Sequence, residues 1–171
     1  RPGADGIRVK DGKRLSLTVV CVSSWPDLAV YAPVMKAQLA KVGIELQPRM
    51  IETFLPVANA GDFDLLFRMT HTGRAGDPTL FLNDSLRSTA VRNFGKYRGT
   101  ELDAVLARLE SELDTAQRDL LVADTQRIVR RDLPLIPVSE APFHVGLSTR
   151  LKDYPLWGAD YYIVRDDLYV Q

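Results

Sequence analysis

The sequence predicts an α/β fold: a lobe with a small mixed sheet flanked by helices, followed by a helical hairpin and an extended C-terminal tail. Two observations predict it. In the first part of the chain, apolar runs rich in β-branched residues alternate with segments of helical periodicity, as in a parallel α/β unit. Farther along, two helical segments follow one another with no strand between them.

The first strand and helix of the α/β unit have clear signals. Alternating apolar residues with β-branched residues between them predict a strand at residues 15–22, before the break at Pro26 and Asp27. The next helix is indicated by apolar residues at spacings of four, four and three, namely Tyr31, Met35, Leu39 and Val42. Gly43 can adopt the left-handed conformation that ends a helix. This helix is expected to cover a sheet.

Two further strands complete the unit. Residues 44–50 alternate apolar and polar side chains, which indicates a strand on the edge side of the sheet. Residues 63–67 form a more continuous apolar run and are expected to be a buried strand. A brief helical turn is expected between the two strands.

The segment from residue 70 to residue 97 lacks a regular pattern, and its apolar anchor is residues 80–82. We expect an ordered loop with one helical turn, because apolar residues are interleaved with glycine, hydroxyl and charged residues. Ordered loops of this length are commonly functional. A ligand is therefore expected at this loop.

Two helices are predicted after the loop. The first begins at Thr100, which is expected to cap the first amides, and its apolar spacing continues to Leu113. The second opens near Asp114 or Thr115, ends at residues 130–132, and directs three residues inward: Leu121, Thr125 and Ile128. The two helices are expected to form a hairpin. The aromatic residues after residue 154 have no regular period, which suggests a segment that packs on another part of a protein.

Composition limits the functional classes. The chain has 171 residues with 22 basic and 22 acidic side chains, so no net charge would attract nucleic acid or an anionic membrane. No apolar run reaches the roughly 18 to 20 residues needed to span a bilayer, and we expect any targeting segment to be absent from this chain. The single cysteine, Cys21, excludes an internal disulfide and is expected to fill the core. No cofactor is predicted.

Taken in order, several segments resemble the second lobe of the extracellular solute-binding proteins that feed ABC importers of the dipeptide, oligopeptide and nickel class: DGKRLSLTVV, AQLAKVGIELQ, GDFDLLF, GDPTLFL, NFGKY and DLPLIPVS. The resemblance implies a periplasmic-binding-protein-like lobe, a small-molecule solute and a membrane ABC permease as partners, and a periplasmic or extracellular location. It also implies that residues 1–140 form the ligand-binding lobe. Residues 141–171 would then return to a first lobe that is absent from this chain.

The resemblance further implies a binding loop. In dipeptide-binding members of the family, the loop after the buried strand has the sequence WTGDxGDP. The first aspartate of this loop binds the amino group of the peptide. In this chain the matching residues 71–78 have the sequence HTGRAGDP. Arg74 takes the position of that aspartate and would favour an anionic group through a bidentate contact. His71 replaces an aromatic ring that stacks on the ligand. The expected solute is a peptide, an opine or a metal chelate with an anionic group.

The candidates in this loop also have plainer interpretations. Arg74 can be a solvated loop charge, and His71 can contact a neighbouring carbonyl. Metal ligation by His71 is disfavoured, because His144 is the one other histidine of the chain. Asp77, before Pro78, is expected to cap the helical turn rather than to bind a solute.

Two further residues are candidates by their place in the fold. Arg68 follows the predicted buried strand and can face either a cleft or solvent. Trp25 follows the first strand, and open α/β sheets place their ligands at the carboxyl ends of strands. Trp25 is therefore a candidate for stacking on a solute.

Catalysis is not expected. The chain has no GxSxG elbow, glycine-rich phosphate loop, HExxH pair or paired-cysteine motif, and Asp62 and Asp64 are badly placed to serve one substrate. An alternative to solute binding is a non-catalytic interaction module that docks on a partner protein through the aromatic C-terminal tail.

Overall fold

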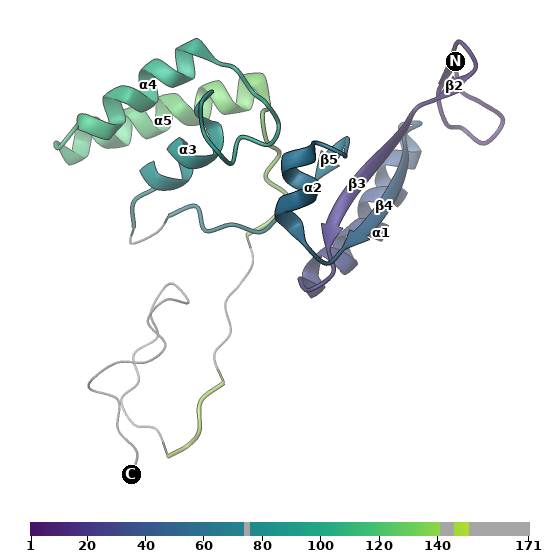
Figure 1. Cartoon of the computed structure of the whole chain (residues 1–171), viewed down its shortest axis with the longest axis horizontal. Helices are drawn as coiled ribbons and strands as arrows, with labels where there is room; N and C mark the ends of the chain where they lie inside the picture. The colour runs from purple at the N-terminus through teal and green to yellow at the C-terminus, as the bar shows by residue number, and fades with distance from the viewer. Residues whose placement is uncertain (74–75, 141–145, 151–171) are drawn as a thin grey trace. The chain divides into compact units, whose positions relative to one another are not determined.

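The computed structural model describes residues 1–73, 76–140 and 146–150 (Figure 1). By their contacts the residues divide into two units, residues 1–135 and residues 136–171. The helices and strands of the described residues all belong to the first unit. Of the second unit, residues 136–140 and 146–150 are described, and they form neither helix nor strand. The aromatic tail and His144 lie outside the described residues.

The first unit contains a parallel sheet of three strands. β3 (Ser16–Val22) lies between β4 (Glu45–Ile51) and the short β5 (Leu65–Leu66). The register pairs Ser16 with Glu45 at one end of β3 and Val22 with Ile51 at the other. β-branched residues favour this extended backbone, and Val19 to Val22 of β3 are almost completely buried. The central strand is therefore β3, as its apolar composition indicates.

Two helices connect these strands, which confirms the predicted order of strand, helix, strand, helix and strand. α1 (Pro26–Lys41) contacts β3 and β4, and α2 (Phe54–Ala60) leads to β5 (Figure 1). Met35 and Leu39 of α1 pack on a core formed by four buried residues: Val19, Cys21, Ala32 and Leu46. Gly43 has a φ of 81°, the left-handed conformation expected after the helix.

The strand predicted at residues 63–67 is shorter and less buried than expected. Only Leu65 and Leu66 pair with β3, and no residue of 63–67 is fully buried. The Thr18 amide of β3 donates a 2.7 Å hydrogen bond to the side-chain carboxylate of Asp64. The Asp64 amide also donates a 3.2 Å hydrogen bond to the Thr18 carbonyl, so Asp64 contacts β3 through its side chain and its backbone just before the paired residues.

Antiparallel pairing occurs in a second, separate sheet. β1 (Val9–Lys10) and β2 (Lys13–Arg14) form a hairpin in which Val9 pairs with Arg14. Arg14 also forms ion pairs with Asp5 and Glu45, which connect this hairpin to the start of β4. Parallel and antiparallel pairs are thus both present in the α/β fold, but they are divided between two sheets.

The rest of the first unit is helical. α3 (Thr79–Leu86), α4 (Thr100–Ser111) and α5 (Thr115–Asp132) share one core, made of Leu82, Leu86, Leu102, Leu106, Leu109, Leu121 and Ile128. α4 and α5 pack against one another, which confirms the predicted hairpin (Figure 1). All three residues of α5 that were expected to point inward are buried.

The ends of the hairpin helices differ in part from expectation. Thr100 is the first helical residue of α4, the cap residue is Gly99, and no side chain caps this end. Leu113 lies beyond α4 and is 91% exposed. Asp114 does cap α5, because its carboxylate accepts a 2.9 Å hydrogen bond from the Gln117 amide.

Candidate functional site

The candidate site lies at the carboxyl ends of the parallel strands. Trp25 comes three residues after the end of β3, Phe54 begins α2 shortly after β4, and Arg68 comes two residues after β5. The carboxyl ends of parallel strands meet at one edge of a sheet, where α/β proteins place their ligand sites. The topology therefore brings residues from three chain segments to one edge.

An aromatic ladder connects this edge to the helical part of the unit. The ring centroids of Trp25 and Phe54 are 6.1 Å apart, and those of Phe54 and Phe94 are 5.4 Å apart in an edge-to-face arrangement. Both distances lie in the range at which aromatic rings attract one another beyond simple burial. Trp25 is partly buried. It is thus held in place from one side by Phe54.

Phe94 is held in place by the loop that precedes α4. The buried Asn93 side chain donates a 2.7 Å hydrogen bond to the Tyr97 carbonyl and accepts a 3.0 Å one from the Tyr97 amide. Lys96, between them, has a φ of 56°. These contacts close a tight turn, and the Phe94 side chain is buried beside it. The turn forms the segment NFGKY.

Arg68 lies where the ladder meets the helices. Its guanidinium carbon is 5.8 Å from the centroid of the Phe94 ring, a cation–π contact, and its Nη2 donates a 2.7 Å hydrogen bond to the Ser85 hydroxyl of α3. Burial lowers the pKa of Arg68 from its ordinary value, and the positive charge of Arg92 lowers this pKa further, while the negative charge of Asp84 opposes part of the shift. No carboxylate of the described residues forms an ion pair with Arg68.

A small cavity of about 130 Å³ adjoins α3, and its lining residues are Thr70, His71, Leu80, Phe81, Asp84, Ser85 and Arg92. Asp84 and Arg92 form a 3.3 Å ion pair on this lining. His71 is exposed. The structure therefore places His71 and Ser85 on the lining of one cavity, joins Arg68 to Ser85 by a hydrogen bond, and connects Trp25 to Arg68 through two phenylalanines. Arg74 lies outside the described residues.

Several residues of this site were not singled out in the sequence. Phe54, Ser85 and Phe94 lie in segments without strong periodicity, so no pattern marks them as site residues. The expected cap at Asp77 is met only in part: its carboxylate accepts a 2.8 Å hydrogen bond from the Thr79 amide at the start of α3, but the cap residue of this helix is Pro78. Among the described residues no group of three His, Cys, Asp or Glu side chains is arranged to hold a metal ion. None of the helices described is long and apolar enough to cross a membrane.

Comparison with known proteins identifies relatives for this chain. No protein-family model matches it. It is 28% identical over 132 residues to the probable deoxycholate-binding periplasmic protein YgiS of Escherichia coli K12, a match that covers 76% of this chain and 24% of YgiS. It is 29% identical over 119 residues to the di/tripeptide-binding protein 4 of Pseudomonas aeruginosa UCBPP-PA14, with coverage of 67% and 22%. The chain thus spans about a quarter of the length of these relatives.

Solved structures show the same fold. The mannohexaose-bound oligopeptide-binding protein of an ABC transporter from Thermotoga maritima superposes with a TM-score of 0.71 at 30% identity, over 79% of this chain and 27% of that one. A nickel ABC transporter protein from Bacillus halodurans gives a TM-score of 0.67 at 26% identity, over 74% and 27%. The periplasmic relatives agree with the periplasmic or extracellular location expected from the sequence. The homologues of this chain are therefore the periplasmic dipeptide-, oligopeptide- and nickel-binding proteins of ABC importers, and the chain has the α/β fold of one part of such a solute-binding protein.

Proposed function

We propose that this chain is part of the substrate-binding component of an ABC importer, and that it forms one wall of a cleft that closes on a small solute with an anionic group. In this proposal residues 1–140 are the ligand-binding lobe, and residues 141–171 pack on a first lobe supplied by the rest of the protein. Binding shifts the population toward a closed form, which a membrane permease recognises. No reaction is catalysed.

The observation that carries this proposal is the environment of Arg68. A partly buried guanidinium loses hydration, and a neutral hydroxyl, an aromatic ring and the charge of Asp84, which is paired with Arg92, compensate for that loss only in part. A carboxylate of the solute would complete the coordination of Arg68 with charge-assisted hydrogen bonds. Arg74 and His71 would contact the same solute from the loop, and Trp25 would stack on it from the end of β3.

The relatives make this solute class reasonable. The names of these relatives give deoxycholate, di- and tripeptides, and nickel as the species that they bind. Deoxycholate and peptides each carry a carboxylate, which is the group a guanidinium binds best. The alternative, an interaction module that docks through the aromatic tail, rests on residues outside the described ranges, and no observation favours it.

The proposal is tested by isothermal titration calorimetry on the full-length protein encoded by the gene. The probes are deoxycholate, Ni(L-His)2, and trialanine beside trialanine amide, because the last two differ only in the charge of the C-terminal group. We expect the acid to bind at least about tenfold more tightly than the amide, and the Arg68→Met variant to lose this preference. The Arg74→Ala variant should lose part of it. Equal affinity for acid and amide would overturn the anionic solute class, and no heat with any probe would contradict solute binding of this kind.

A further inference from the structure

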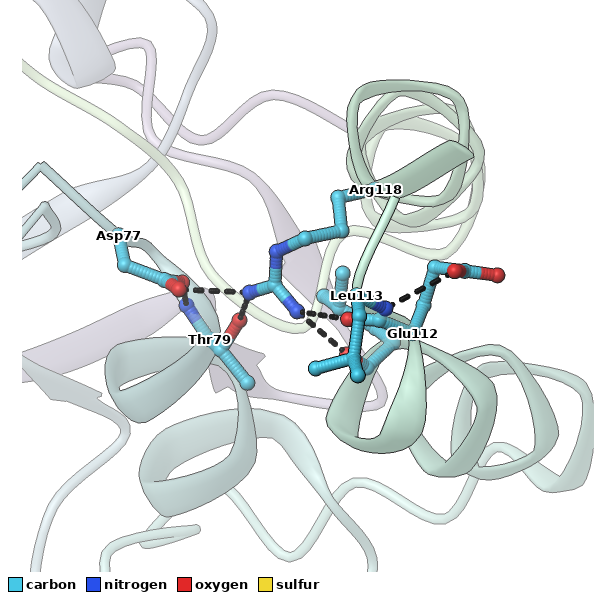
Figure 2. A network of polar contacts seen from close by, with 6 residues as sticks. Asp77, Thr79, Glu112, Leu113 and Arg118 are labelled. Atoms are coloured by element: carbon cyan, nitrogen blue, oxygen red, sulfur yellow. Dashed lines mark hydrogen bonds and ion pairs between the residues drawn. The ribbon is translucent and has the colours of Figure 1, made fainter. Parts of the chain in front are cut away.

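The guanidinium of Arg118 connects three separate elements (Figure 2). Its Nη1 donates hydrogen bonds of 2.9 Å to the Leu109 carbonyl and 2.8 Å to the Glu112 carbonyl at the end of α4. Its Nη2 donates bonds of 2.6 Å to Asp77 Oδ2 and 2.7 Å to Thr79 Oγ1 at the start of α3. Arg118 itself belongs to α5. One side chain therefore links the end of the loop before α3 to the α4–α5 hairpin.

The two hydrogen bonds from Arg118 to α4 stabilise the end of that helix. The last carbonyl groups of an α-helix have no partner within the helix. Arg118 supplies donors to two carbonyls at this end, and so stabilises the junction where the chain turns from α4 into α5. These two bonds explain why an arginine occurs near the first turn of α5, but they do not explain the contacts to Asp77 and Thr79.

The other two contacts of Arg118 involve the loop that precedes α3 and the start of that helix. Asp77 uses one carboxylate oxygen for the Thr79 amide and the other for Arg118, so its position is defined from two sides (Figure 2). Hydrogen bonds from Thr79, and then the charge of Arg118, lower the pKa of Asp77. Just before Asp77, the Gly76 amide donates a 3.2 Å hydrogen bond to the Gly73 carbonyl.

We propose that Arg118 is a positioning residue for the described part of the loop before α3, residues 70–73 and 76–77, which carries the proposed contact of His71 with the solute. The inference rests on the proposed function for the role of the loop, but the anchoring by Arg118 is independent of any solute. Nη2 of Arg118 donates to both Asp77 Oδ2 and Thr79 Oγ1, and a charge-assisted contact with two acceptors restricts the position of the guanidinium more than a single neutral hydrogen bond does. Helix α5 thereby determines where the loop lies although it contributes no side chain to the candidate site.

Variants of this network separate the two roles of Arg118. Asp77→Asn keeps the acceptor for the Thr79 amide but removes the ion pair, so it affects only the loop side. Arg118→Gln affects both sides. The matched control is Arg127→Gln, because Arg127 lies on the same helix and pairs with the carboxylate of Asp124 without touching the loop. Urea unfolding of each variant shows the conditions under which all of them remain folded.

Amide hydrogen exchange of the full-length protein, read by mass spectrometry, then tests the inference. We expect the amides of residues 70–73 and 76 to exchange about tenfold faster in Asp77→Asn and Arg118→Gln, with the exchange of α5 unchanged in Asp77→Asn. The double variant should be no faster than Arg118→Gln alone, since both changes remove one shared contact. Unchanged loop exchange in Asp77→Asn would overturn the inference.

Calorimetry with trialanine on the same variants distinguishes this inference from the proposed function. If trialanine binds, we expect about a fivefold to tenfold loss of affinity in Asp77→Asn and none in Arg127→Gln. If the wild-type protein binds none of the four probes but the loop exchange still changes, the proposed function fails and the positioning by Arg118 stands. If trialanine binds equally to all variants while the loop exchange changes, the loop is anchored by Arg118 but does not contact the solute, which overturns the proposed role of the loop.

Discussion

The guanidinium of Arg68 lies over the ring of Phe94, with 5.8 Å between its Cζ atom and the ring centroid. The two residues come from different parts of the first unit, since Arg68 follows β5 and Phe94 belongs to the turn before α4. Together with the hydrogen bond from Arg68 to Ser85, this contact joins the sheet to the helices and orients the one cation proposed at the sheet edge. A solute that binds Arg68 would therefore meet a group whose direction is already set.

Ser85→Ala is expected to weaken the binding of trialanine to the full-length protein by about fivefold to tenfold. The substitution removes the hydrogen bond from Arg68 to the Ser85 hydroxyl, and a bond of a charged donor contributes about 1.5 to 3 kcal/mol, of which part is recovered from water. Calorimetry measures the change. Ser111→Ala is the control, because Ser111 bonds the Arg108 carbonyl on the exposed side of α4. Equal affinities of the two variants would show that Ser85 does not orient Arg68.

Gly43→Ala is expected to destabilise the protein more than Gly61→Ala. Both glycines have a positive φ, 81° and 71°, so both alanines carry the strain of the left-handed conformation, about 1 to 2 kcal/mol. At Gly43 a Cβ would also lie 2.6 Å from Arg8 Cγ and 3.1 Å from the Gly6 carbonyl oxygen, whereas nothing lies within 4 Å at Gly61. Urea unfolding midpoints compare the two variants, and an equal loss would contradict the predicted close approach.

Tyr97→Phe is expected to make the free energy of unfolding fall less steeply as the pH becomes alkaline. Burial, and then the hydrogen bond to Asp132, raises the pKa of Tyr97 to about 12. Between about pH 10 and about pH 12 the folded state keeps the Tyr97 proton and the unfolded state releases it. The contribution of Tyr97 to the free energy of unfolding is therefore complete below about pH 10 and is lost as the pH rises through about 12. Unfolding by urea at about pH 9 and about pH 11 should show a larger fall in the wild type than in the variant. Parallel profiles would refute the assignment.

Leu106→Ala is expected to cost about 2 to 5 kcal/mol of unfolding free energy, because it leaves a cavity where α3, α4 and α5 share a core. Leu120→Ala provides the comparison, since Leu120 is 56% exposed on α5 and its loss should change stability by less than about 0.5 kcal/mol. Chemical denaturation followed by circular dichroism measures both. A cost at Leu106 no greater than at Leu120 would contradict the position of this core.

The candidate site could be predicted only in outline. Trp25 and Arg68 were recognisable because strand ends are visible in the hydrophobic pattern, and strand ends are where such sites form. Phe94 and Ser85 were not recognisable, because each lies in a segment whose role depends on a partner far along the chain. Asp77 is expected to cap the helical turn, and its carboxylate does bond the first amide of α3, although the cap residue is Pro78. Its ion pair with Arg118 joins residues 41 positions apart. No local pattern reports such a pair.

The helical and extended segments were accessible from the chain alone, since periodicity is a property of about a dozen neighbouring residues. It identified the inward face of α5 at Leu121, Thr125 and Ile128 and the helix end at Gly43. Tertiary structure alone decided where β5 pairs with β3, because the contacts of Asp64 and Leu65 with that strand join residues 46 positions apart. It alone also decided the direction of Arg68, because the ring and the hydroxyl that orient a guanidinium come together only when the sheet and the helices have packed.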